Sequence, residues 1–317
     1  MAGIIAVYNR KGGATKTSTV FNVAGVLAKK YKKKVLVIDL DGGQGNITSR
    51  FLREDIDDYA KMGLDFFEGK VTMEDLFVDP TKVNEAIYSS RIGVRNGSLA
   101  KKRGVDIIPF KPESTEKDYD YNDIERMLLL EDDKEVRYSY MKQILGNIRR
   151  TRSHPYDYDF ILIDFPPSLT ELCYCALASV DYILVPSVVD INSLEGFQGI
   201  LNTVNTLKTK GINPNVELLG LFLARLKPVS SYDSQMIVYL KELLGNTMME
   251  TAIRESDELR WSSHNSVPLC WTKRNHPITK DYEHLTMEIL FRLGMLPKED
   301  EKELVEAIVD FNSKYGL

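Results

Sequence analysis

The sequence predicts an α/β fold with a mostly parallel central sheet and helices on both faces. Short apolar runs rich in β-branched residues alternate with helix-like stretches along the chain. Three of these runs end next to residues suited to phosphate or metal chemistry. The 317 residues are enough for a sizeable core, and no apolar run approaches the length of a membrane span. We therefore expect residues 1–317 to form one domain.

The alternation can be followed from one end of the chain to the other. Two clear helical patterns, at residues 17–31 and 194–207, lie between strand-like runs. The predicted strands are residues 4–8, 35–39, 105–109, 160–164, 182–186, 218–223 and 248–253. Alternation of this kind favours a parallel sheet that is covered on both faces.

Two segments are expected as additions to this core. Residues 111–150 are rich in charge and tyrosine, with an acidic run at Glu131, Asp132 and Asp133 that we interpret as a solvated face. The second half of this segment, residues 138–150, is predicted to be helical. A charged helix at residues 298–315 has one apolar stripe, which predicts docking on the core.

Charge, cysteine content and the first residues indicate what kind of surface and which compartment to expect. The formal net charge is −5, which argues against a surface that is basic all over, although a local basic patch stays open. Three cysteines do not make a disulfide framework and are expected as buried thiols in a reducing environment. The first residues enter a strand-like run directly, so we expect no signal peptide and a cytoplasmic protein.

A phosphate-binding loop is predicted between the first strand and the first helix. Its residues are Lys11, Gly12, Gly13, Ala14, Thr15, Lys16, Thr17 and Ser18. In a strand–loop–helix context, the backbone N–H groups of such a loop face phosphate groups. Lys16 would supply a positive charge to the β and γ phosphates, and the Thr17 hydroxyl would bind Mg²⁺.

Carboxylates follow two of the strand-like runs. The run at residues 35–39 ends with Asp39, and Asp41 follows, while the run at residues 160–164 ends with Asp164. Open α/β sheets bind their ligands at the carboxyl ends of the strands. Acids at this edge can hold Mg²⁺ through water and can orient an attacking water molecule.

Together these motifs resemble the ParA family, whose members are P-loop ATPases with a deviant Walker A motif. Lys11-Gly12-Gly13 with Lys16-Thr17-Ser18 matches the signature of the family's phosphate loop. The segments 39–46 and 164–169 are similar to its two acidic motifs. Val185-Pro186 and Leu194-Glu195-Gly196 match later blocks, so the resemblance covers nearly the whole chain, with residues 111–150 as its weakest part.

The resemblance implies roles for matching positions, with ATP and Mg²⁺ as cofactors. Lys11 is similar to the lysine that reaches across a dimer to the partner's nucleotide. Asp41 is similar to the residue that positions the hydrolytic water, and Asp39 and Asp164 resemble the acids near Mg²⁺. The adenine side resembles residues 253–257, which include Ile253, Arg254 and Glu255.

Three positions depart from the family's pattern. Thr15 stands where most members have glycine, and a β-branched residue restricts the backbone there. Gly42 and Gly43 replace a proline after Asp41 and add one residue. The segment 253–256 lacks the family's Ile-Pro-Arg-Asn.

As a function, the resemblance implies partition of plasmid or chromosomal DNA in association with the nucleoid. An ATP-bound homodimer would bind double-stranded DNA without sequence preference, and a ParB-like centromere-binding protein would trigger hydrolysis. The start of the chain resembles the short form of the family, which has no N-terminal DNA-binding domain. The candidate DNA contacts late in the chain are basic. They are Lys208, Lys210, Arg225, Lys227, Lys273 and Arg274.

Two alternatives use the same ATPase core. A MinD-like switch at a membrane surface would need a basic amphipathic last helix, whereas the last helix of this chain is acidic. A related cargo-positioning role, with DNA as the track, stays open. An iron–sulfur ATPase would need cysteines from two loops, and no cysteine precedes Asp164. Because the last helix is acidic, we expect no membrane partner.

Overall fold

The computed structural model describes most of the chain. The described residues are 3–42, 46–91, 104–111, 121–148, 157–189, 193–227, 231–273 and 275–315. Arg274 and Gly43, both considered above, lie outside them.

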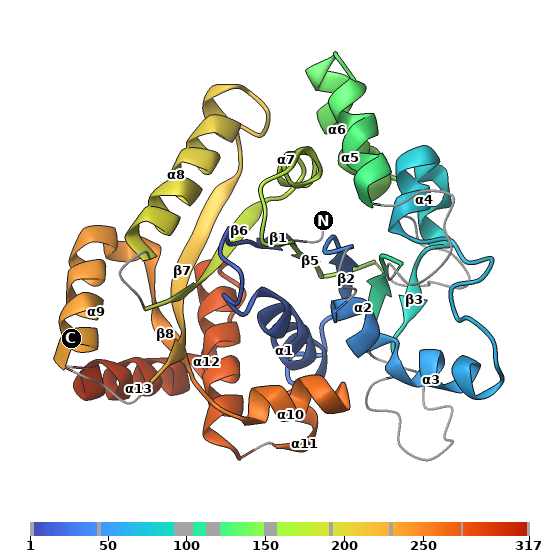
Figure 1. Cartoon of the computed structure of the whole chain (residues 1–317). Coiled ribbons are helices and arrows are strands. Elements are labelled where there is room, and N and C mark those ends of the chain that lie inside the picture. Colours follow the sequence, from blue (N-terminus) through green and yellow to red (C-terminus); the bar gives the residue numbers. More distant parts are fainter. Residues whose placement is uncertain are drawn as a thin grey trace.

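Eight strands form one sheet, which confirms the predicted fold class (Figure 1). Their order is β3-β4-β2-β5-β1-β6-β7-β8, and all neighbours are parallel except β3 and β4. The strands are β1 Gly3–Val7, β2 Val35–Asp39, β3 Tyr88–Ser89, β4 Val105–Ile108, β5 Phe160–Asp164, β6 Tyr182–Val188, β7 Glu217–Leu226 and β8 Met248–Arg254. The prediction missed β3, because two residues carry no detectable periodicity.

Helices cover both faces of the sheet (Figure 1). They are α1 Lys16–Lys29, α2 Asn46–Phe51, α3 Arg53–Lys61, α4 Met73–Val78, α5 Tyr121–Leu130, α6 Lys134–Gly146, α7 Glu171–Leu177, α8 Ser193–Thr209, α9 Ser231–Leu244, α10 Glu258–Asn265, α11 Leu269–Thr272, α12 Pro277–Arg292 and α13 Lys298–Tyr315. Two short 3₁₀ turns, η1 Pro80–Asn84 and η2 Gly245–Thr247, complete the described elements.

Alternate residues of the central strands build two separate cores. On β2, Leu36 and Ile38 pack on the side of α4 to α9, whereas Val35 and Val37 pack on the side of α1, α2 and α12. Because a parallel sheet is buried on both faces, its strands read as continuous apolar runs, and this made them visible in the sequence. All three cysteines are free and buried, as expected.

The segment between β4 and β5 differs from the prediction. Its second helix is α6, which begins at Lys134 and ends at Gly146, rather than covering residues 138–150. The Asp133 side chain accepts hydrogen bonds from the backbone N–H groups of Glu135 and Val136. One residue of the acidic run therefore caps a helix, and its side chain stays exposed to solvent.

The outer edge of β8 is covered by two carboxylates of α12. Glu288 accepts hydrogen bonds from the backbone N–H groups of Glu250 and Thr251 at 2.9 and 2.8 Å. Asp281 accepts one from the backbone N–H of Arg254 at 3.0 Å. Three N–H groups of β8 are thus occupied by side chains of α12.

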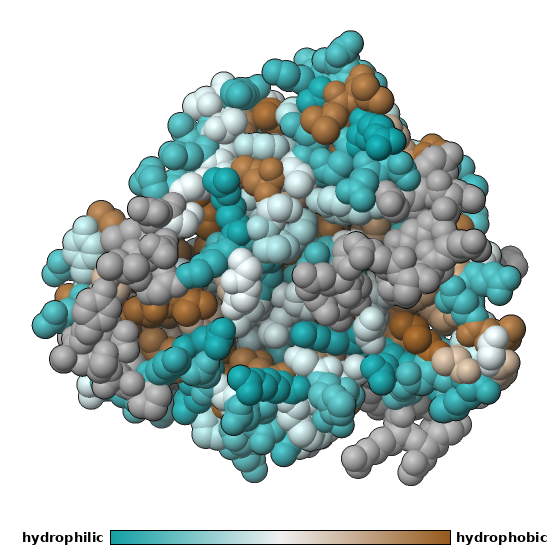
Figure 2. All heavy atoms as spheres, in the orientation of Figure 1, coloured by the Kyte–Doolittle hydropathy of each residue, from teal (hydrophilic) through white to brown (hydrophobic). Residues whose placement is uncertain are grey.

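The surface in the view of Figure 2 is mostly hydrophilic with scattered apolar spots, one of them over the α5–α6 hairpin. In the described part of the chain, no helix combines the length and apolarity that crossing a bilayer requires. The C-terminal helix α13 has the expected bounds, and its Leu304 is buried.

Candidate functional site

The loop between β1 and α1 lies at the carboxyl edge of the sheet, between the ends of β5 and β6. Asn9 fixes it there: its side-chain amide donates to the carbonyl of Pro186 at 2.6 Å, and its side-chain oxygen accepts from the N–H of Lys11 at 2.9 Å. A buried asparagine thus ties the start of the loop to β6. The sequence motifs give no sign of this role for Asn9, because its partner is 177 residues away.

Two residues of the loop have left-handed backbone conformations. Gly13 has φ of +73°, which glycine adopts without strain. Thr15 has φ of 63° and ψ of 18°, a region in which a β-branched residue is an outlier. The Thr15 hydroxyl is buried and makes no hydrogen bond in the described part of the chain, nor does it cap α1.

Lys16, the first residue of α1, is buried beneath this loop. Its ammonium lies 3.4 Å from the carbonyl oxygen of Lys11. Burial lowers the pKa of Lys16, and the nearby carboxylates of Asp164 and Asp41 oppose that shift. A cation held in this way is ready to meet phosphate charge.

Asp39 and Asp164 form a buried carboxylate pair at the ends of two neighbouring strands. They are in register across β2 and β5, and both are fully buried. Burial raises the pKa of Asp164 to about 7, partly opposed by the Thr17 hydroxyl and by Lys16 and Arg50. Burial and the neighbouring Asp164 together raise the pKa of Asp39.

The two carboxylates differ in their hydrogen bonds. Asp39 accepts from the hydroxyl of Thr48 at 2.6 Å and from the N–H of Asp41 at 2.9 Å. Neither oxygen of Asp164 makes a hydrogen bond of ordinary geometry with the described residues. Orphaned carboxylate oxygens beside the Thr17 hydroxyl suit a small divalent cation that binds oxygen ligands and water.

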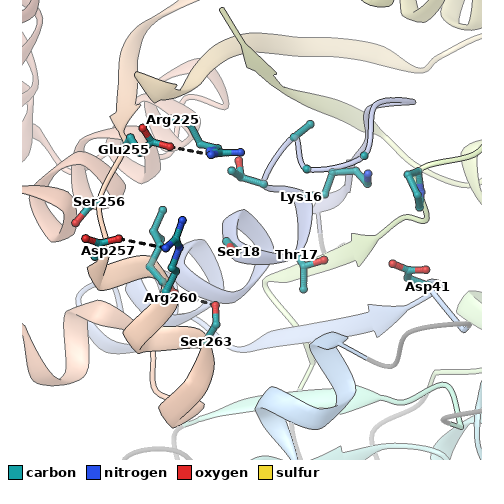
Figure 3. A pocket seen from close by; sticks show the side chains of 16 residues that line it. Lys16, Thr17, Ser18, Asp41, Arg225, Glu255, Ser256, Asp257, Arg260 and Ser263 are labelled. Carbon is teal, nitrogen blue, oxygen red and sulfur yellow. Dashed lines mark hydrogen bonds and ion pairs between the residues drawn. The ribbon is translucent and has the colours of Figure 1, made fainter. Parts of the chain in front are cut away.

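Asp41 is half-buried and faces the same cavity as Lys16 (Figure 3). Burial raises the pKa of Asp41, and Lys16 opposes the shift. The residue after Asp41 is Gly42, where the family has proline, and the structure gives a reason: a Cβ at this position would lie 2.5 Å from the ring of Phe110. The ring of Phe110 therefore occupies the space that a larger residue would need.

These groups line one end of a cavity of about 920 Å³ (Figure 3). The phosphate loop, Lys16, Thr17 and Asp41 lie at one end of the view. At the other end, Arg225 pairs with Glu255 at 2.7 Å, and Arg260 pairs with Asp257 at 3.7 Å. The cavity therefore offers a glycine-rich end with a buried lysine for phosphates and a separate polar end.

The second end corrects part of the prediction for residues 253–255. Glu255 lines the cavity, but Ile253 is packed in the core. The guanidinium of Arg254 is bound by both oxygens of Asp281 at 2.6 and 2.7 Å, on the side of α12. Ser256 and Asp257, which complete the predicted range 253–257, also line the cavity. Sequence reasoning missed Leu259, Arg260 and Ser263, which follow on α10.

The predicted DNA contacts do not form one patch. Arg225 has φ of 56° where the pairing of β7 with β8 shifts register, and this irregularity directs it into the cavity. Lys227 lies 3.9 Å from Glu255. Lys208 and Lys210 are exposed at the end of α8, just before β7 begins, and so at the opposite edge of the sheet (Figure 1).

Comparison with known proteins supports these observations. The AAA_31 family model, an AAA domain, matches residues 2–218. A ParA family protein of Mycoplasma pneumoniae is 31% identical over 217 residues, which is 68% of this chain and 68% of that protein. The chromosome-partitioning ATPase Soj of Treponema pallidum is 26% identical over 294 residues, 93% of this chain and 99% of that protein.

A solved structure is similar in fold. The ATP complex of a McdA variant from Cyanothece has a TM-score of 0.69 at 19% identity, and the likeness covers 93% of this chain and 98% of that one. At this identity the comparison shows that the two chains share a fold.

Proposed function

Because the chain belongs to the ParA family of P-loop ATPases, we propose that it partitions plasmid or chromosomal DNA as an ATP-dependent dimer. The observation that carries this proposal is the cavity in which the phosphate loop, Lys16 and Asp41 meet beside two buried carboxylates. ATP with Mg²⁺ fits this arrangement of groups. Relatives that carry the name of a chromosome-partitioning ATPase support the role in segregation.

In this proposal the loop residues bind the phosphates through their backbone N–H groups, with Lys16 between the β and γ phosphates. Thr17, Asp39 and Asp164 would hold Mg²⁺, directly or through water, and the bound ion would supply charge stabilisation at the transferring phosphoryl group. Asp41 orients the attacking water. Each of these roles is assigned to a group that lies at the phosphate end of the cavity or directly beneath it.

Lys11 acts in trans on the nucleotide of the partner subunit. It is exposed on the outer surface of the loop, and its backbone is held by Asn9. A cation supplied across a dimer neutralises charge on the transferring group, as an arginine finger does. The Arg225–Glu255 pair and Arg260 form the base end of the site.

The ATP-bound dimer binds double-stranded DNA through exposed lysines and meets a ParB-like partner on the nucleoid. A chain with a net charge of −5 has no long-range attraction for DNA as a monomer, whereas a two-fold dimer presents two copies of each local basic patch. Lys208 and Lys210 are the DNA contacts we propose. Arg225 and Lys227 are reassigned to the rim of the nucleotide cavity.

Filter binding on random and defined duplexes tests this function. We expect binding only with ATP and Mg²⁺, equal on any sequence, with affinity that falls steeply as salt rises. Changing Lys208 and Lys210 together to alanine should weaken binding on all sequences. It should also reduce the slope of the logarithm of DNA affinity against the logarithm of salt concentration by about two per protomer. Equal binding with ADP and ATP would remove the switch, and no binding to any DNA would favour a MinD-like or cargo-positioning ATPase.

A further inference from the structure

A second cavity, of about 800 Å³, lies away from the nucleotide site between α6, α7 and the end of α8. Its lining is mostly polar and charged. The residues are Lys134, Glu135, Arg137, Tyr138, Ser139 and Lys142 of α6, Glu171 and Tyr174 of α7, and Thr206, Lys210, Gly211 and Ile212 at the end of α8. We call this cavity the α6–α8 groove.

The groove concentrates positive charge in an acidic protein. Four of its lining residues are cations and two are carboxylates, so its charge is 4 − 2 = +2, in a chain of net charge −5. Lys134 and Lys142 are eight residues apart on one face of α6, and Lys210 lies across the groove. All three are exposed, and none pairs with a carboxylate in the described part of the chain.

Unpaired like charges that face one another repel, and an anion between them relieves this repulsion. The groove is concave, which suits a peptide better than the broad cylinder of a duplex. Two tyrosines, Tyr138 and Tyr174, add aromatic surface to its walls. From Lys134 to Lys142 the helix rises about 12 Å, the length of about four extended residues.

The groove is also connected to the nucleotide site. The first turn of α7 begins seven residues after Asp164 in the sequence, and the α5–α6 hairpin holds it from two sides. Glu125 of α5 accepts hydrogen bonds from the N–H groups of Glu171 and Leu172 at 3.1 and 2.9 Å. Arg137 of α6 lies 3.3 Å from the carboxylate of Glu171.

We propose that the α6–α8 groove binds an acidic peptide segment of a partner protein, and that this binding changes ATP turnover through the start of α7. A carboxylate of the partner competes with Glu171 for Arg137, which loosens the contact between the hairpin and α7. Only the effect on turnover rests on the proposed ATPase function.

Fluorescence anisotropy with fluorescein-labelled hexaglutamate tests binding without any nucleotide. We expect binding to wild-type protein at low salt, and at least tenfold weaker binding when Lys134, Lys142 and Lys210 are all changed to glutamine. A matched control removes three exposed lysines of α3 and α13 instead, with the substitutions Lys61→Gln, Lys298→Gln and Lys302→Gln. This control should bind as wild type does, and circular dichroism should show both variants folded.

Absent binding, or an equal loss in the control, would overturn the proposal. A labelled duplex is the second probe: if it binds and hexaglutamate does not, and a variant with only Lys134→Gln and Lys142→Gln loses the duplex, the groove belongs to the DNA surface. Lys208→Ala and Lys142→Ala separate the two surfaces, because Lys208 does not line the groove. We expect the first to weaken only DNA binding and the second only peptide binding.

The link to α7 is tested by steady-state ATP turnover. Hexaglutamate should change the rate of wild-type protein at least twofold and leave that of Arg137→Gln unchanged. An equal change in both proteins would refute the route through Arg137. Absence of turnover in every protein would refute the proposed ATPase function, while the anisotropy experiment would still decide whether the groove binds an acidic peptide.

Discussion

Thr15 is held in a conformation that a β-branched residue adopts at a cost, and Thr15→Gly should therefore stabilise the nucleotide-free protein. Its φ of 63° lies in the left-handed region. Its hydroxyl is buried without a hydrogen bond among the described residues. The side chain does not cap α1, so its removal sacrifices no capping bond.

The expected gain combines three contributions. Relief of the left-handed backbone is worth about 1–2 kcal/mol. Removal of an unsatisfied buried hydroxyl adds about 1 kcal/mol, and the greater entropy of glycine in the unfolded chain subtracts about 0.5–1 kcal/mol. The free energy of unfolding should therefore rise by about 1–2.5 kcal/mol.

Urea unfolding followed by circular dichroism measures this change, with the denaturant midpoint and slope compared between proteins. Lys32→Gly is the matched control, because Lys32 has φ of 56° but is an exposed residue. The free energy of unfolding of Lys32→Gly should change only by the relief of the left-handed backbone and the entropy of glycine, without the hydroxyl contribution. Thr15→Ala keeps a Cβ at positive φ and should gain less than Thr15→Gly. If Thr15→Gly is less stable than wild type while Lys32→Gly gains, the strain argument fails.

Four further perturbations test the site. Lys16→Ala should abolish ATP binding in isothermal titration calorimetry, because its buried ammonium is placed beneath the loop; wild-type affinity would remove Lys16 from the site. Asp41→Ala should still bind ATP and accumulate as a dimer by light scattering, with much slower phosphate release; full turnover or a monomer would show that its role is different. Gly42→Ala places a Cβ 2.5 Å from Phe110 and should cost about 1–3 kcal/mol of stability in urea, and an unchanged midpoint would mean that the ring moves freely. Without Mg²⁺ and nucleotide, the free energy of unfolding should fall as the pH rises from about 4 to about 7, because the buried Asp164, with its pKa raised to about 7, holds its proton more tightly in the folded state than in the unfolded state. Thermal unfolding of wild-type protein should therefore give a lower Tm at pH 8 than at pH 5, and Asp164→Asn should reduce this difference. An equal difference in both proteins would assign the effect to other groups.

The parts of the fold and site that the sequence predicted are those with local signals. A strand that is buried on both faces is a continuous apolar run, so β2 and β5 and the acids at their ends could be recognised directly. Their alignment in the sheet, Asp39 beside Asp164, follows from parallel pairing. The strand–loop–helix context likewise predicted where the phosphate loop begins and ends.

The parts that the sequence did not predict depend on contacts between distant segments. Asn9 binds Pro186, and Arg225 turns into the cavity because of an irregularity in β7. Arg254 points away from the cavity because Asp281 of α12 binds it. A motif gives the order of residues along a strand, but not the direction that a side chain takes after the strand ends.

The carboxylates along β8 bear on how copies of this protein meet. An outer strand with free N–H groups is a template on which another chain can add a strand, the first step toward aggregates. Glu288 and Asp281 occupy three such groups on β8, and the opposite edge of the sheet is β3, which is only two residues long. Open-ended addition of strands from further copies of the chain is therefore disfavoured at both edges of the sheet.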